Sequence, residues 1–194
     1  MKKLLLFIIL LLVMQTTLLA QSTEEDRMLL EQVGPEKFKE LAIQRLKQTK
    51  AMVYQAGEAN SATINQATTG SKPNVAIITQ IGALNQATLT QQGHGNTLTA
   101  TQNGTNNTYS GYMDGYNNSS KVVQTGSGNE INQLIDGSGL DYTLIQEGHN
   151  NTINQKESSL NSRSYKVVQQ GNNMNITIEQ SNWGVPVTIS ATKK

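Results

Sequence analysis

Residues 80–107 read QIGALNQATLTQQGHGNTLTATQNGTNN, and the pattern Gln-x-Gly-x-x-Asn occurs three times within this stretch, at intervals of eleven residues. The same pattern begins again at Gln55, Gln124 and Gln146. A short fixed period is typical of solenoids and stacked arrays rather than of a globular core. The repeat therefore predicts a chain that builds surfaces or polymers more readily than an enclosed active site.

The first twenty residues have the layout of a secretory signal peptide. Lys2 and Lys3 precede an apolar run over residues 4–13, and small residues lead up to Ala20. The apolar run is too short to span a bilayer comfortably. We therefore expect a signal peptide at residues 1–20. The chain has no Cys, so neither a lipidated N-terminus nor a disulfide framework is open to it.

The composition points away from an ordinary globular protein. Hydrophobic residues make up 36% of the chain and aromatic residues 5%, which is low for a conventional core. Charged residues make up 15% with a formal net charge of +1, so the highly charged disordered class fits poorly. The chain lacks the basic stripe that nucleic-acid binding requires, and we expect no nucleic-acid partner.

Charge is concentrated near the N-terminus. Twelve charged residues lie between positions 22 and 50, against fifteen in the rest of the chain from Ala51 onward. Pro35 suits the first turn of a helix, and the apolar residues after it fall near helical spacing, namely Phe38, Leu41, Ala42 and Leu46. We predict a separate helical segment at residues 21–48.

The repeat itself reads as strands. Each half is seven residues, Asn-x-x-x-x-x-Gln, followed by a four-residue turn. Thirteen halves fill residues 49–191, which makes about six and a half repeats of 22 residues, and residues 192–194 form a C-terminal tail. With the Asn counted as position zero, position two is apolar in twelve halves and position four in ten, failing at Gly111, Gln133 and Gln155. Position three is mostly polar, so each half predicts a strand with one buried face.

The Asn at position zero and the Gln at position six share parity with the apolar positions, so they point inward too. Buried amides without partners would be unfavourable by about 1–3 kcal/mol each. Equivalent amides on rungs about 4.8 Å apart can bond to one another as ladders. The residues predicted to form such ladders are Gln55, Asn60, Gln66, Asn74, Gln80, Asn85, Gln91, Asn96, Gln102, Asn107, Asn118, Gln124, Asn129, Gln146, Asn151, Gln169 and Gln180.

A glycine follows most of these Gln residues by two positions. Glycine permits a positive φ, which a tight reversal between strands requires. The predicted turn residues are Gly57, Gly82, Gly93, Gly104, Gly115, Gly126, Gly137, Gly148 and Gly171. Two strands and two turns make one 22-residue rung, so we predict an all-β fold, a β-solenoid of strand-turn-strand repeats with a short helical N-terminal segment.

These residues resemble the curlin repeat of curli fibres, whose pattern is Ser/Asn-x5-Gln-x-Gly-x-x-Asn-x5-Gln. Residues 74–91 match it in full, from Asn74 through Gln80, Gly82 and Asn85 to Gln91. The resemblance extends over roughly residues 49–191. It is specific, because four residue types recur at fixed offsets in many copies.

The resemblance implies a secreted structural subunit of extracellular amyloid fibres on the surface of a Gram-negative bacterium, with roles in biofilm matrix and adhesion. Its implied partners are itself, other curlin subunits, and an outer-membrane secretion pore with accessory factors. Whether the chain is the major subunit or the minor, nucleating one stays open. The charged N-terminal segment differs from the Gly-rich leader of the major curlin, and the second halves lose their Gln at Met113, Ile135 and Glu157.

Other functions fit the sequence less well. An ice-binding β-solenoid would need aligned Thr rows on successive rungs, and the row at Thr97, Thr99 and Thr101 is followed by Lys121 at the next equivalent position. An adhesin domain that shares the period without polymerising is the other alternative. His94 and His149 are both in predicted turns with no Cys or third His to complete a metal set. We expect no catalytic residues, no metal, no cofactor and no enzymatic activity.

Overall fold

The computed structural model describes residues 51–159, 163–181 and 188–193, and these residues form strands and no helix. In this part of the chain no helix has the length and apolar character needed to cross a membrane. The predicted signal peptide at residues 1–20 and the predicted segment at residues 21–48 lie outside the described residues.

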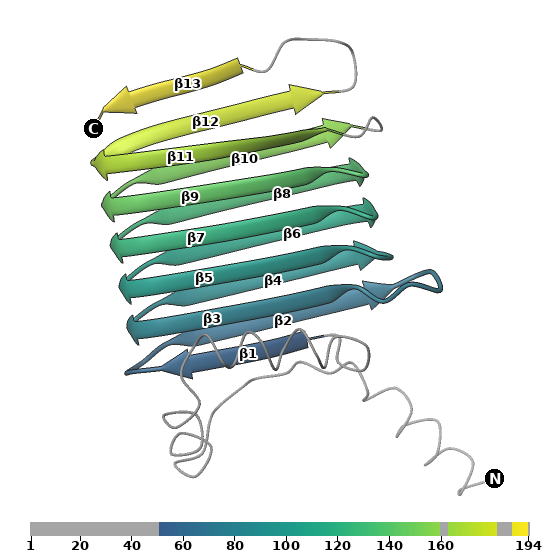
Figure 1. Cartoon of the computed structure of the whole chain (residues 1–194), viewed down its shortest axis with the longest axis horizontal. Helices are drawn as coiled ribbons and strands as arrows, with labels where there is room; N and C mark the ends of the chain where they lie inside the picture. Colours follow the sequence, from purple (N-terminus) through teal and green to yellow (C-terminus); the bar gives the residue numbers. More distant parts are fainter. Residues whose placement is uncertain (1–50, 160–162, 182–187, 194) are drawn as a thin grey trace, which may run out of the picture.

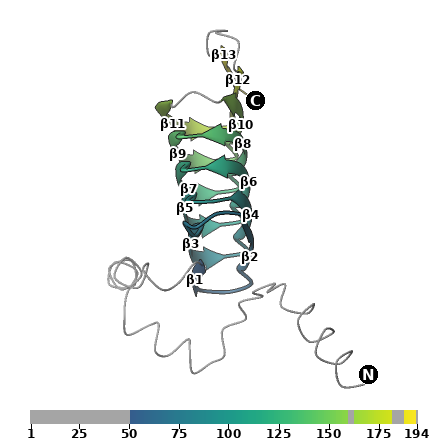
Figure 2. The ribbon, with the colours of Figure 1, turned by 90° about the vertical axis from the view of Figure 1, so that its right-hand side faces the viewer.

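The strands form two facing sheets, and the chain alternates between them (Figures 1 and 2). Sheet A contains, in order, β1 (Ala51–Ala56), β3 (Val75–Ala83), β5 (Thr97–Thr105), β7 (Ser119–Ser127), β9 (Asp141–His149) and β11 (Ser164–Asn172). Sheet B contains β2 (Ser61–Thr68), β4 (Gln86–Gly93), β6 (Thr108–Tyr116), β8 (Glu130–Ser138), β10 (Thr152–Ser159), β12 (Met174–Ser181) and β13 (Thr188–Lys193).

Strands β1 to β12 pair in parallel and in register with the equivalent strand of the next rung. Gln80 lies opposite Gln102, and Gln102 opposite Gln124, so residues of the central rungs meet their counterparts 22 positions later. The offset is 25 for the first rung and 23 for the last, where the loops are longer. The three extra residues of the first repeat fall between β2 and β3, where they enlarge a loop without shifting the register. The predicted all-β solenoid is confirmed, with six turns made of one strand from each sheet.

The C-terminal strand departs from the prediction. The last half-repeat would add a seventh parallel strand to sheet A, but β13 pairs antiparallel with β12 in sheet B, with Ile178 opposite Ile189. Thr192 and Lys193, expected in a tail, belong to this strand. The position of β13 means that the chain folds back on its own last rung, which satisfies the backbone groups along one edge of β12.

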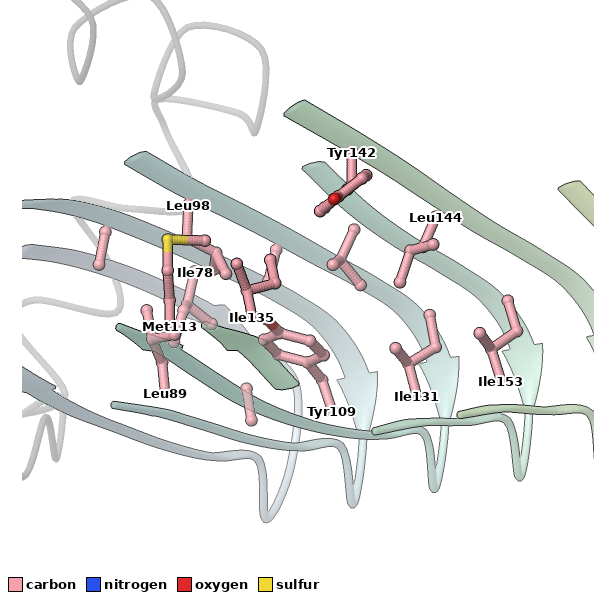
Figure 3. Packing of buried hydrophobic residues seen from close by; sticks show 14 of the residues in the cluster. Ile78, Leu89, Leu98, Tyr109, Met113, Ile131, Ile135, Tyr142, Leu144 and Ile153 are labelled. Atoms are coloured by element: carbon pink, nitrogen blue, oxygen red, sulfur yellow. The ribbon is translucent and has the colours of Figure 1, made fainter. Parts of the chain in front are cut away.

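The interior between the sheets is a narrow column of apolar side chains from positions two and four (Figure 3). Leu98 and Ala100 of β5 face this space with Leu89 of β4, and all three are fully buried. The predicted alternation is therefore confirmed, because the inward rows bury their side chains while neighbouring rows such as Thr99 and Lys121 stay accessible. Such a column has no room for a large enclosed pocket.

The turns use two positive-φ residues where the sequence indicated one. The first is the predicted glycine, with φ between 88° and 130° at Gly57, Gly82, Gly93, Gly104, Gly115, Gly126, Gly148 and Gly171. The second comes two residues later, with φ between 52° and 69° at Ala59, Leu84, Gly95, Asn106, Asn117, Gly128, Gly139, Asn150 and Asn173. The strands run through the first position, so the chain reverses at the second.

Gly137 is the exception among the predicted turn glycines, because its φ is not positive. At this turn Gly139 alone supplies the left-handed residue. A non-glycine partner does not explain the difference, because Gly93 keeps a φ of 88° although it pairs with Thr68.

Candidate assembly site

The glutamines of sheet A form one continuous column. Each side chain donates from Nε2 to Oε1 of the next rung, at distances of 2.6, 2.7, 2.9, 3.0 and 2.8 Å along Gln55, Gln80, Gln102, Gln124, Gln146 and Gln169. From Gln80 to Gln169 these residues are at most 1% exposed. All donors point in the same direction along the stack, so the column has a donor end and an acceptor end.

The same amides also tie sheet A to sheet B. Gln102 Nε2 donates to the backbone carbonyl oxygens of Gln86, at 2.9 Å, and of Asn107, at 3.0 Å. Gln80, Gln124 and Gln146 donate in the same way, at 2.9–3.0 Å, to the backbone carbonyl oxygen of the first residue of a strand in sheet B. These acceptors are Ser61 on β2, Thr108 on β6 and Glu130 on β8. Each buried amide is thus satisfied by a side chain above it and by backbone beside it, which is the condition for burying it without penalty.

The asparagines occupy the corners, and the two corners differ. At the first corner, Asn107 donates from both its backbone N and its Nδ2 to Asn85 Oδ1, at 3.1 and 3.0 Å. At the second corner only the backbone N of Asn118 reaches Asn96 Oδ1, at 3.0 Å. In both corners Nδ2 bonds a turn glycine carbonyl on the next rung, as Asn118 does to Gly137 at 2.9 Å.

These bonds refine the predicted ladder. The first corner contains Asn60, Asn85, Asn107, Asn129 and Asn151, and the second contains Asn74, Asn96 and Asn118. In the first corner, side chain to side chain bonds join Asn60 to Asn129 through Asn85 and Asn107, while Asn151 is joined to Asn129 through its backbone N. The second corner is held by bonds between side chains and backbone. The asparagines therefore fix the turns of adjacent rungs to each other more than they bond among themselves.

The glutamine column of sheet B is short. Gln66 donates to Gln91 Oε1 at 2.7 Å, and the next residue along the column is Met113, whose Sδ lies 3.9 Å from Gln91 Nε2. Gln91 Nε2 also donates to the backbone carbonyl oxygen of Val75 at 3.3 Å. Further along, Ile135 and Glu157 occupy the same row, and both are fully buried. The two sheets are thus unequal, since only sheet A carries amides from one end of the solenoid to the other.

Glu157 brings a buried carboxyl group into this row near the C-terminal end. With its amide oriented to suit the network, Gln180 donates to Glu157 Oε2 at 2.6 Å and accepts from Arg163. Neither Glu157 Oε1 nor the Tyr142 hydroxyl has a hydrogen bond within the described part of the chain. Burial raises the pKa of the Glu157 carboxyl, although the nearby Tyr142 and Arg163 oppose the shift. Gln180, predicted to join an amide ladder, therefore hydrogen-bonds the carboxyl group of Glu157 instead.

A second row of hydrogen-bonded polar side chains runs through the core, and the sequence pattern did not predict it. Ser120 Oγ and Tyr109 Oη both donate to Gln133 Oε1 at 2.9 Å, and Gln133 donates to Gln155 Oε1 at 2.7 Å. Gln155 donates in turn to Tyr165 Oη at 2.7 Å. The sequence did carry a signal for this row, because two of the three exceptions at the otherwise apolar position four are Gln133 and Gln155.

Gly111, the third exception at position four, makes room for this row of polar side chains. A Cβ at Gly111 would collide with the Tyr109 hydroxyl, so the missing side chain lets the phenol lie along its own strand. The turn glycines stack in a similar way. A Cβ on Gly104 would collide with the carbonyl oxygen of Gly126 on the next rung. At turns where this glycine has a positive φ and another rung follows, the rung spacing therefore leaves no room for a side chain.

The two ends of the stack are not equivalent. At the N-terminal end β1 and β2 are the last strands of their sheets among the described residues. At the C-terminal end β11 is the last strand of sheet A, while β13 covers the edge of β12 in sheet B. The Gln column of sheet A therefore runs between two edge strands, and sheet B is closed at one end by its own chain.

Parallel, in-register rungs with stacked amides and exposed strand edges define a β-solenoid suited to continued stacking. Residues 74–104 match the model of the curlin associated repeat, which confirms the resemblance over β3, β4 and most of β5. No curated protein and no solved structure matches the chain.

Proposed function

We propose that this chain is a secreted structural subunit of an extracellular curli-type amyloid fibre, in which copies stack end to end. The observation that carries the proposal is the directed Gln column between the edge strands of sheet A. Gln169 lies at the donor end on β11 and Gln55 at the acceptor end on β1. A second copy stacked head to tail would continue the column with the same polarity, whereas tail-to-tail stacking would place like groups together.

The curlin repeat supports the same role, because it supplies the pattern that makes every rung a template for the next. We propose that export uses a dedicated outer-membrane pore with accessory factors, that the partners in the fibre are further curlin-type subunits, and that the chain has no enzymatic activity. The interrupted sheet B column and the β13 cap favour a minor or nucleating subunit over a bulk fibre builder.

An ice-binding role is not favoured by the outer surface. Thr97, Thr99 and Thr101 on β5 lie beside Ser119, Lys121 and Val123 on β7. A flat threonine array therefore does not continue from one rung to the next in sheet A.

The test is to incubate residues 21–194 with an amyloid-binding dye, alone and as seed for a regular curlin subunit. We expect a dye-positive fibre with a cross-β diffraction spacing of about 4.8 Å along its axis. A chain that stays monomeric and dye-negative, and does not shorten the lag of the regular subunit, would refute the proposal in favour of a non-polymerising solenoid.

A further inference from the structure

The outer face of sheet A changes character along the stack. The side chains that point away from the core on β1 and β3 are mostly apolar, namely Met52, Tyr54, Ala56, Val75, Ile77, Thr79 and Ile81. On β5 the equivalent side chains are all polar, namely Thr97, Thr99, Thr101 and Asn103. We call the outward side chains of β1 and β3 the apolar face. It is two strands wide.

Three side chains of this apolar face are buried although they do not face the core, and the other four are partly buried. Tyr54 is 4% exposed, Ile77 7% and Thr79 1%. Neither Tyr54 nor Ile77 belongs to the core cluster, which contains their inward neighbours Ala76 and Ile78. Two rungs further on, Lys121 in the same row as Ile77 is exposed. Burial on the outer side of a sheet requires a further layer of protein over it.

The described strands do not supply that layer, because β1 and β3 make their main contacts with the neighbouring strands of their own sheet. We propose that residues 36–47 of the same chain cover the apolar face as an amphipathic helix. Phe38, Leu41, Ala42 and Leu46 of this segment lie at helical spacing, and its remaining apolar residue, Ile43, falls outside that stripe. The rest of its surface is rich in Lys, Arg and Glu, which suits the solvent side.

The dimensions agree with this assignment. A helix of these twelve residues is about 18 Å long, close to the roughly 20 Å of a six-residue strand such as β1. Its diameter of about 10 Å covers two strands spaced about 4.8 Å apart, the number that carry apolar outward side chains. Residues 48–50 join the segment to β1 and reach about 10 Å, enough to cross from a helix layer to a sheet.

The tether favours this occupant over a second copy. A segment held three residues from its binding face has an effective concentration in the millimolar range. An uncovered apolar sheet face would also promote side-by-side association of solenoids. The helix therefore shields one side of the subunit and leaves its strand edges for stacking. This inference does not depend on fibre formation.

The test uses the absence of Cys in the chain. In freshly prepared monomer, a cysteine in Ile77→Cys should react with a thiol reagent at least about tenfold more slowly than one in Thr99→Cys, because the helix must open first. Adding Leu41→Asp and Leu46→Asp should remove this protection. The matched control, Lys47→Glu, changes the net charge by the same two units on the side of the helix opposite Phe38 and should leave the protection intact.

Protection of Ile77→Cys that survives the Leu41→Asp and Leu46→Asp changes would overturn the proposal. Protection that appears only at high protein concentration would overturn it too, because it would assign the face to a second copy. A second measurement does not depend on destabilised variants. A flexible bifunctional thiol reagent, which does not need the strict geometry of a disulfide, should link the two cysteines of a Leu41→Cys, Ile77→Cys double variant within one monomer. The absence of that intramolecular link would contradict the placement of the helix.

Discussion

The Gln column of sheet A should contribute measurable stability, and Gln102→Met isolates that contribution. Methionine nearly matches glutamine in shape, so the change removes hydrogen bonds with little loss of packing. It would leave a Gln80 Nε2 hydrogen without its acceptor and Gln124 Oε1 without its donor. At about 1–3 kcal/mol for each stranded buried group, the local free energy of unfolding should fall by about 2–6 kcal/mol.

The matched control is Gln91→Met on sheet B. That row already continues into Met113, so among side-chain amides Gln91→Met removes a partner from Gln66, which is only partly buried, and it also removes the weak 3.3 Å bond to the Val75 carbonyl oxygen. The control should therefore lower the free energy of unfolding by less than half as much. Native-state hydrogen exchange suits the comparison, because it reads the opening of individual rungs in a repeat protein.

In β3, β5 and β7 of the Gln102→Met variant, exchange should accelerate by at least about 30-fold, since each 1.4 kcal/mol is a factor of ten. Equal effects of the two substitutions would refute the reasoning, because they would mean that a continuous column adds nothing beyond an isolated amide pair. Exchange as slow as in the unmodified chain would refute it as well, and would place the stability of the rungs in the backbone ladder and apolar core alone.

Three further predictions follow from the ends and the turns. Because the pKa of Glu157 is raised in the folded state, its contribution to stability is fully present below the unfolded pKa near 4.3 and is lost as pH rises through the folded pKa. The protection of β10 and β12 amides, measured relative to the intrinsic exchange rate at each pH, should therefore fall from pH 4 to pH 8, and Glu157→Gln should abolish that fall. Gly104→Ala should destabilise the chain by about 1–3 kcal/mol in urea unfolding, since φ is 130° and the next rung's carbonyl is in the way, whereas Gly128→Asn at φ 64° should be tolerated because Asn already occupies that position in other turns. Deleting residues 182–194 removes β13 and opens the edge of β12, so the lag in a dye-binding assay should shorten; an unchanged or longer lag would show that β13 does not limit stacking.

The local pattern was enough to predict most of the interior. Alternation with a period of two assigns each side chain to a face, so the burial of Leu98, Gln102 and Asn107 could be read from the repeat. The identity of each hydrogen-bond partner could not. It depends on how the corners of adjacent rungs meet. Only the structure shows that Asn107 Nδ2 donates to the Asn85 side chain, whereas Asn118 Nδ2 donates to the backbone carbonyl of Gly137.

The period of eleven, the parity of the strands and most of the positive-φ glycines were determined by the sequence alone, because each depends on neighbours a few residues apart. The antiparallel return of β13, the polar chain from Tyr109 to Tyr165 and the buried outer face at Tyr54 and Ile77 were decided only by the tertiary structure. Each of these arises between segments that meet through stacking or folding back. Nothing in the local repeat specifies which surfaces the ends of the stack and the flanking segment will cover, since that depends on contacts made after the rungs have formed.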